Sequence, residues 1–153
     1  MDASFLSEIQ ILKNLNDNER NIVLERTKKE IFKKNETIFR EGDHGDSLYI
    51  IIEGTVRIST FIAGIGEETL AILSDGEIFG EMPLIDNNLR SAHAIAHKDS
   101  ILLVMTRESF LYIIDNYKNI GIKILQELIN NFCLRFKNTC ENLKNFYLMD
   151  KFC

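Results

Sequence analysis

The chain has 153 residues, 45% of them hydrophobic, which is the length and composition of one compact domain. We therefore predict a single domain over residues 1–153. The formal net charge of −5 argues against a nucleic-acid-binding surface, which usually carries clustered basic residues. No stretch approaches the length of a membrane span, and the N-terminus lacks the basic start and apolar run of a secretion signal. We expect a cytoplasmic protein with no direct contact to membrane or nucleic acid.

The cysteines do not predict a metal or redox centre. Cys133, Cys140 and Cys153 are odd in number and lack the close pairing of a zinc or iron–sulfur site. We expect reduced thiols, no metal ligands and no tightly bound cofactor.

The first part of the chain, residues 5–26, carries apolar residues at helical spacing. Asn16, Asp17 and Asn18 interrupt this pattern with residue types that cap helices. The pattern predicts two short N-terminal helices.

Residues 30–105 change to short apolar runs, many β-branched, separated by glycine or aspartate turns. Strands at this regular spacing are typical of a closed or sandwiched antiparallel sheet. The predicted strands are residues 30–33, 37–40, 47–52, 55–61, 68–73, 78–79, 91–97 and 101–105.

Residues 79–92 combine a glycine, an acid, a short helical turn and one arginine. A phosphate is bound by backbone N–H donors at a helix start and by a cationic fork. Gly80 lets the backbone come close, Pro83 suits a first helical turn, and Arg90 supplies the fork. Glu81 can then accept a hydrogen bond from a sugar hydroxyl. The alternative interpretation is a surface loop with one acid and one base.

This run, Phe-Gly-Glu followed by an apolar pair, a polar loop and Arg-Ser-Ala, resembles the phosphate-binding cassette of cyclic nucleotide-binding domains. These domains occur in catabolite-activator-type regulators and kinase regulatory subunits. The resemblance extends upstream through residues 38–54 and covers residues 5–148. Pro83 departs from it, because the family often has a small residue there. The resemblance implies a mainly β fold with flanking helices: an antiparallel jelly-roll barrel, short N-terminal helices and a long C-terminal helix.

The resemblance also implies a ligand site. Arg90 would neutralise the cyclic phosphate, the amides near Ser91 and Ala92 would add donors, and Glu81 would accept from the ribose 2′-hydroxyl. The apolar walls around sugar and base would be Ile58, Leu70, Ala71 and Met82. We expect a receptor for a cyclic nucleotide and favour cAMP over cGMP, although Ser91 is compatible with either.

The last part of the chain, residues 106–149, predicts a helix over 109–116 and a long one over 119–149. The long helix carries a seam whose residues are separated by alternating steps of three and four: Ile122, Leu125, Ile129, Phe132, Phe136, Thr139, Leu143 and Phe146. Such a heptad seam favours a two-helix partner, most simply in a homodimer. A second apolar edge of Ile120, Ile124 and Leu128 could instead cover the barrel, and both faces can be used.

The resemblance leaves two candidates for the residue that caps the base. In catabolite-activator-type members, a segment similar to residues 139–143 places a threonine over the base, which points to Thr139, with Cys140 where the family often has serine. Counting forward from Arg90 with the family's spacing points to Arg135, which could stack on the base.

We expect no catalysis. A metal-dependent jelly-roll (cupin-like) enzyme is an alternative, but His93 and His97 lack an evident third ligand. The second alternative is a purely structural dimerisation module. Family regulators continue into a helix-turn-helix, whereas this sequence ends at residue 153, so we expect no DNA-binding domain. Either it is a stand-alone receptor acting on a separate effector protein, or it is a regulator cut at its hinge.

Overall fold

The computed structural model of the protein describes residues 3–150 and begins with three short helical segments. They are α1 (Ala3–Glu8), the 3-10 helix η1 (Gln10–Leu12) and α2 (Asp17–Leu24). Asn16 caps α2: its side chain accepts a hydrogen bond from the Glu19 amide, and the Glu19 side chain accepts one from the Asn16 amide. This reciprocal cap explains why the predicted interruption starts a new helix.

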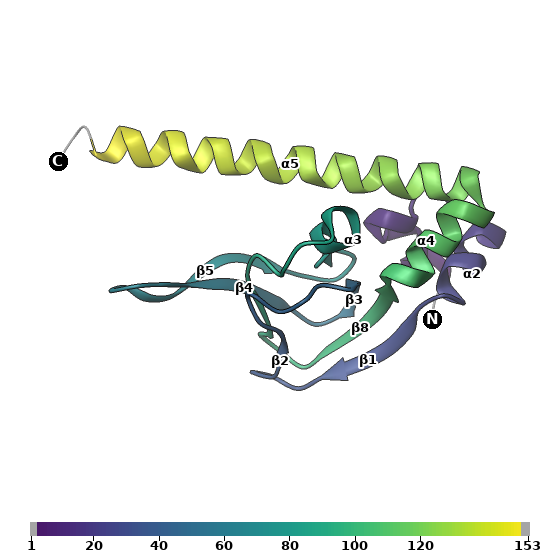
Figure 1. The fold of residues 1–153 in the computed structure, drawn as a ribbon, viewed down its shortest axis with the longest axis horizontal. Coiled ribbons are helices and arrows are strands. Elements are labelled where there is room, and N and C mark those ends of the chain that lie inside the picture. Colours follow the sequence, from purple (N-terminus) through teal and green to yellow (C-terminus); the bar gives the residue numbers. More distant parts are fainter. Residues whose placement is uncertain (1–2, 151–153) are drawn as a thin grey trace.

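Eight antiparallel strands in the described chain form two four-stranded sheets that make a jelly-roll-like β sandwich (Figure 1). The first sheet has the order β1 (Lys28–Phe32), β8 (Ser100–Thr106), β3 (Ser47–Glu53) and β6 (Ile78–Phe79). The second has the order β2 (Thr37–Phe39), β7 (His93–Ala96), β4 (Val56–Ile62) and β5 (Gly66–Leu73). The predicted fold class is therefore confirmed.

Several strand boundaries differ from the predicted ones by two residues. β1 begins at Lys28 and β5 at Gly66, each two residues early, whereas β7 begins at His93, two residues late. At β7 the cause is local. The Arg90 amide donates to the Asp43 carbonyl at 2.8 Å, so the chain pairs with the turn after β2 before it joins the sheet.

The core has two parts, one on each side of the first sheet. Between the two sheets lies a cluster of Tyr49, Ile51, Val56, Leu73, Phe79, Ala94, Leu102 and Val104. On the other face, the helices cover a larger cluster built from β3, β8, η1 and the C-terminal helices. Burial of these apolar side chains is the main driving force for the fold.

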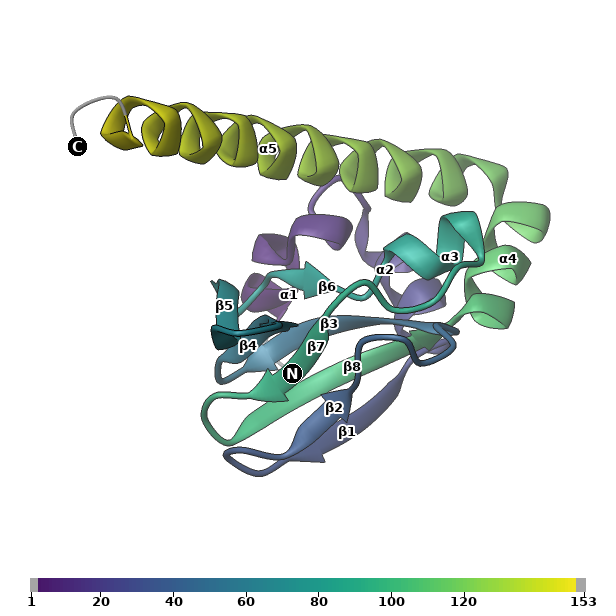
Figure 2. The same cartoon turned by 60° about the vertical axis from the view of Figure 1, so that its left-hand side comes forward.

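The remaining helices are α3 (Met82–Asp86), α4 (Arg107–Asn116) and α5 (Lys118–Asp150). The long α5 runs the length of the molecule, with α3 between it and the sheets (Figures 1 and 2). The predicted inner edge of α5 is buried, since Ile120, Ile124 and Leu128 are at most 4% exposed.

Most of the heptad seam of α5 faces away from this core, but Leu125 packs against it and Phe132 is half-buried. Five of its residues are between 54% and 71% exposed: Ile122, Ile129, Phe136, Leu143 and Phe146. Cys133 and Cys140 on the same helix are free thiols, and Cys153 lies outside the described residues. Within the described part of the chain, every helix is too short or too polar to span a lipid bilayer.

Polar contacts attach the first half of α5 to the N-terminal helices. Glu127 is 2% exposed. Its carboxylate lies 2.7 Å from Lys13 Nζ and accepts a hydrogen bond from the Asn14 side-chain amide at 2.5 Å. Lys123 donates to the Glu19 carboxylate at 2.7 and 2.8 Å. A buried carboxylate needs such partners, so these contacts fix this part of α5 on the domain.

Candidate ligand-binding site

The site begins at Gly80, where the chain leaves β6. Its φ of +73° lies in the left-handed region, and an added Cβ would lie 2.8 Å from Arg90 Nη1 and 3.2 Å from the Ser47 carbonyl. Glycine is needed here both for the backbone conformation and for the close approach of Arg90.

Replacing Gly80 with alanine should therefore destabilise the protein more than the same change at Gly64. Gly64 also has a positive φ, +84°, but an added Cβ would meet nothing within 4 Å. Both variants carry the left-handed strain of about 1–2 kcal/mol, and only Gly80→Ala adds a collision. Urea unfolding measures both. Equal losses of unfolding free energy would show that Gly80 is needed for its backbone conformation alone.

Glu81 and α3 form one side of the site. The Glu81 side chain is 3% exposed. The Glu81 backbone carbonyl accepts a hydrogen bond from the Leu84 amide at the start of α3. Pro83 lies in the first turn of α3, as predicted. Arg107 donates to the carbonyls of Pro83 and Leu84, each at 2.9 Å, and so holds α3 against the sandwich.

Arg90 is the central charge of the site and is only 4% exposed. Its Nη1 donates to the Gly80 carbonyl at 2.8 Å, whereas its Nε is buried without a hydrogen-bond partner in the structure. Burial lowers the pKa of Arg90, and the charges of Tyr49, Asp46, Asp43 and Glu81 act in the opposite direction. Arginine nevertheless remains protonated. The buried Arg90 guanidinium is therefore a cation whose Nε–H donor is still available.

A cavity of about 180 Å³ lies next to these groups. Its lining includes most of the predicted site residues: Ile58, Leu70, Gly80, Glu81, Met82, Arg90, Ser91, Ala92 and Arg135. Leu70 and Met82 are nevertheless 59% and 44% exposed, so they form an open rim. Ala71 is not part of the lining; it packs against the apolar cluster between the sheets.

The structure distinguishes the two candidates on α5. Arg135 reaches the site: its Nη1 donates to the Glu81 carboxylate at 3.1 Å, and its Nη2 donates to the Ile78 carbonyl. Thr139 is exposed, and its hydroxyl donates to the Arg135 carbonyl within the helix at 2.9 Å. Within one chain, Arg135 is therefore the α5 residue at the cavity.

Sequence reasoning missed the aromatic wall of the cavity. Phe39 and Phe79 both line it, and their ring centroids are 6.0 Å apart. Tyr49 stacks on Phe79 with centroids 5.0 Å apart and an interplanar angle of 11°. These rings come from three strands, and in the sequence they look like ordinary apolar strand positions.

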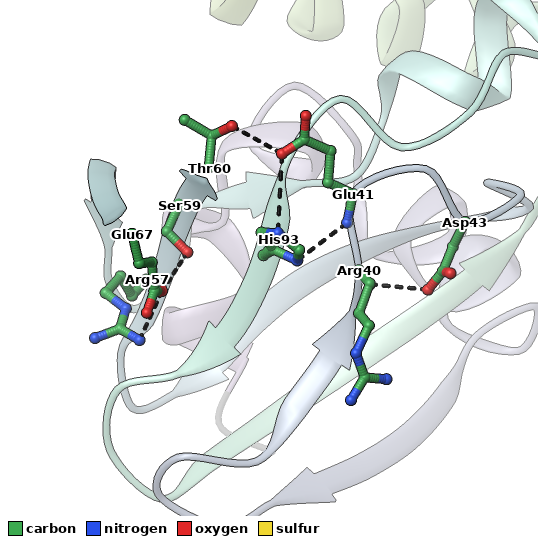
Figure 3. Close-up of polar contacts among 8 residues, drawn as sticks. All are labelled: Arg40, Glu41, Asp43, Arg57, Ser59, Thr60, Glu67 and His93. Carbon is green, nitrogen blue, oxygen red and sulfur yellow. Dashed lines mark hydrogen bonds and ion pairs between the residues drawn. The ribbon is translucent and has the colours of Figure 1, made fainter. Parts of the chain in front are cut away.

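A second polar cluster lies in the other sheet and in the turn after β2 (Figure 3). Thr60 donates to the Glu41 carboxylate at 2.7 Å, and the Glu41 amide donates to His93 Nδ1 at 3.2 Å. The metal-enzyme alternative relied on His93 and His97. In residues covered by the structure, no group of three or more His, Cys, Asp or Glu side chains is placed to hold a metal ion.

A larger depression of about 460 Å³ lies where α4 meets α5. It is open, and it is lined by Glu19 and residues 115–120, whose only lysine is Lys118. Lys123 already neutralises Glu19. This depression lacks the buried unpartnered donor that distinguishes the Arg90 cavity, so the smaller cavity is the candidate site.

Comparisons with known proteins match more than half of the chain to one family. The model of the family "Cyclic nucleotide-binding domain" matches residues 29–117, more than half of the chain and including all the cavity residues up to Ala92. The cyclic AMP receptor protein of Thermus thermophilus is 40% identical over 96 residues, which are 63% of this chain and 44% of that protein. The cGMP-dependent protein kinase 2 of Mus musculus is 32% identical over 109 residues, which are 70% of this chain and 14% of the kinase.

The fold gives the same result. The crystal structure of Thermus thermophilus Catabolite Activator Protein superimposes with a TM-score of 0.78 and 31% identity, over 88% of this chain and 62% of that one. The matched region spans less than half the length of each of the two curated relatives named above. With its jelly-roll-like sandwich, its Gly80–Arg90 turn and this family match, the chain belongs to the cyclic nucleotide-binding domain family.

Proposed function

We propose that this chain is a receptor for a cyclic nucleotide, which binds in the Arg90 cavity. The observation that carries the proposal is the buried Arg90 guanidinium, which lines a cavity together with Glu81 and whose Nε has no hydrogen-bond partner among the described residues. A singly charged cyclic phosphate supplies the anion that such a guanidinium binds. Glu81 accepts from the ribose 2′-hydroxyl, and the amides near Ser91 and Ala92 add donors to the phosphate.

We favour cAMP as the ligand. The relative with 40% identity is named a cyclic AMP receptor protein, and the kinase with 32% identity is named for cGMP. Identity over the matched region therefore supports cAMP, while Ser91 at the rim is compatible with either base. The chain acts as a regulatory module without catalysis, is located in the cytoplasm, and transmits its ligand-dependent shape to an effector protein.

Ligand binding moves α5 through Arg135. The Glu81 carboxylate is bonded to Arg135 in the structure, and the ribose hydroxyl competes for the same oxygens. The cavity of about 180 Å³ is also smaller than the roughly 300–1,000 Å³ of common ligand pockets. A bound nucleotide therefore displaces the Arg135 side chain and shifts α5 from one packing to another. A ligand with different affinities for the two packings shifts their populations.

The seam of α5 forms a homodimer in this proposal. Ile122 and Ile129 occupy one set of core heptad positions and Leu125 the other, a combination that favours two-stranded parallel coiled coils. Apart from the half-buried Leu125 and Phe132, the face is exposed in the single chain, and its partner is a second copy of α5. Thr139 is the polar core position that sets the register of the two helices.

A thermal-shift series tests the proposed ligand. We expect cAMP at a hundred times its dissociation constant to stabilise the protein by about 2.7 kcal/mol, or about 5–10 °C for a domain of this size. cGMP should raise the unfolding temperature less than cAMP does, and the linear control 5′-AMP should leave it almost unchanged. A cyclic dinucleotide tests for a larger ligand. No shift with either cyclic mononucleotide would contradict the proposal.

Amide hydrogen exchange across residues 119–149 tests the movement of α5. We expect exchange to change around Arg135 when cAMP binds, while residues 120–128, fixed by Glu127 and Lys123, stay protected. Unchanged exchange over the whole helix would indicate binding without movement of α5.

A further inference from the structure

The Arg90 guanidinium lies on an aromatic surface. Its Cζ is 4.1 Å from the centroid of the Phe39 ring and 5.6 Å from that of Tyr49. The Phe39 and Tyr49 centroids are 5.6 Å apart, and the Phe79 ring stacks on Tyr49. Three strands, β2, β3 and β6, therefore contribute one ring each to a continuous cluster beneath the arginine.

No carboxylate among the described residues forms an ion pair with Arg90. Its one hydrogen bond there goes to the Gly80 carbonyl, and Asp43, Asp46 and Glu81 act on it only through their longer-range field. A contacting carboxylate would occupy the in-plane N–H donors of the guanidinium. An aromatic ring instead attracts the cation through its face, which leaves the N–H groups at the edge of the guanidinium available.

From this arrangement, and resting on the proposed function, we propose that Phe39 is a positioning residue for the ligand's phosphate. Its ring holds the Arg90 guanidinium in place by a cation–π contact and keeps the Nε donor free until the phosphate arrives. Phe39 thus does for Arg90 what a carboxylate partner does for other buried arginines, without neutralising the charge that the ligand needs. Because the guanidinium is held before binding, less side-chain freedom is lost when the anion binds.

The competing explanation is that Phe39 only fills space between the sheets. Phe32 provides the matched comparison, because it packs against the same apolar cluster, while the rings that Arg90 contacts among the described residues are those of Phe39 and Tyr49. Phe39→Leu and Phe32→Leu each remove one phenyl ring from the same cluster, but only Phe39→Leu removes a contact with the Arg90 guanidinium. Phe39→Tyr keeps the aromatic face and tests whether the function can be rescued.

The experiment combines cAMP titration calorimetry with NMR of the ligand-free protein. We expect Phe39→Leu to weaken cAMP binding about tenfold or more, Phe39→Tyr to stay within about threefold of the parent, and Phe32→Leu likewise. In the NMR spectra, the Arg90 Nε–H proton should lie upfield through the ring current and exchange slowly with water. Phe39→Leu should remove both features, and Phe32→Leu neither.

The outcomes separate this inference from the proposed function. Binding of neither cAMP nor cGMP by the parent would contradict the proposed function, while the Arg90 signal in the ligand-free protein would still test the ring contact. Parent-like affinity in Phe39→Leu, or an equal loss in Phe32→Leu, would overturn the positioning role of Phe39. An Arg90 Nε–H signal that is the same in the parent and in Phe39→Leu would overturn it as well.

Discussion

Arg90→Ala is expected to reduce cAMP affinity by about a hundredfold to several thousandfold, which is the largest effect that we predict for this protein. The alanine leaves the cyclic phosphate buried without its cation, and removing one member of a buried ion pair costs about 3–5 kcal/mol. Since each 1.4 kcal/mol corresponds to a tenfold change in affinity, binding should nearly disappear. Titration calorimetry with cAMP measures the effect.

Two controls make this test specific. Arg40→Ala makes the same change in net charge at an exposed position after β2, where the hydrogen bonds to Asp43 come from the Arg40 backbone, which the substitution keeps (Figure 3). It should bind cAMP like the parent. Arg90→Lys keeps the charge without the guanidinium fork, so an intermediate loss is expected. Thermal unfolding confirms that each variant is folded, and Arg90→Ala affinity within tenfold of the parent would contradict the proposal.

The reason for this large effect lies in the cost of keeping Arg90 buried. Its pKa is lowered by burial, so the domain maintains a desolvated charge that an exposed arginine would not have. The Gly80 carbonyl, the Phe39 ring and the field of distant carboxylates offset part of this cost, and no contacting carboxylate in the described chain neutralises the cation. An arriving phosphate completes the site, which links local electrostatics to ligand affinity.

The parts of this molecule that could be predicted from sequence are those whose pattern lies within one continuous stretch of residues. The short apolar runs between turns predicted the strands of the sandwich, and Asn16 marked the start of α2. Residues 79–92 form the turn that carries Arg90, because a single stretch of chain contains the glycine, the acid and the arginine. Each of these patterns depends on local backbone geometry, which sequence spacing describes well.

The contacts between distant segments could not be predicted in the same way. Arg135 and Thr139 are four residues apart on one helix, so spacing places both on similar faces, and only the packing of α5 shows that Arg135 reaches Glu81. The aromatic cluster joins Phe39 to the rings of Phe79 and Tyr49, which come from two other strands. The partners of Glu127 are more than 100 residues away in the chain, and no periodic signal predicts such a pairing.

The proposed homodimer leads to the second large effect. Phe136 lies on the seam of α5 and is 71% exposed in the single chain. In a parallel dimer the two Phe136 side chains face each other, and burying each phenylalanine contributes about 1.5–3 kcal/mol. Phe136→Glu removes both contributions and brings two negative charges together. We expect the dimer to weaken at least a hundredfold, measured by analytical ultracentrifugation over a series of protein concentrations.

Asn138→Glu is the matched control, because it adds the same charge two residues away on an exposed position outside the seam. It should leave the dimerisation constant close to that of the parent. Phe136 does not line the Arg90 cavity, so monomeric Phe136→Glu should retain a folded cassette whose cAMP affinity can be compared with that of the dimer. The α5 interface would be refuted if the parent protein stayed monomeric at about 100 μM, which is a hundred times a dissociation constant of about 1 μM. Equal dissociation of both variants would instead point to a charge effect without a specific seam.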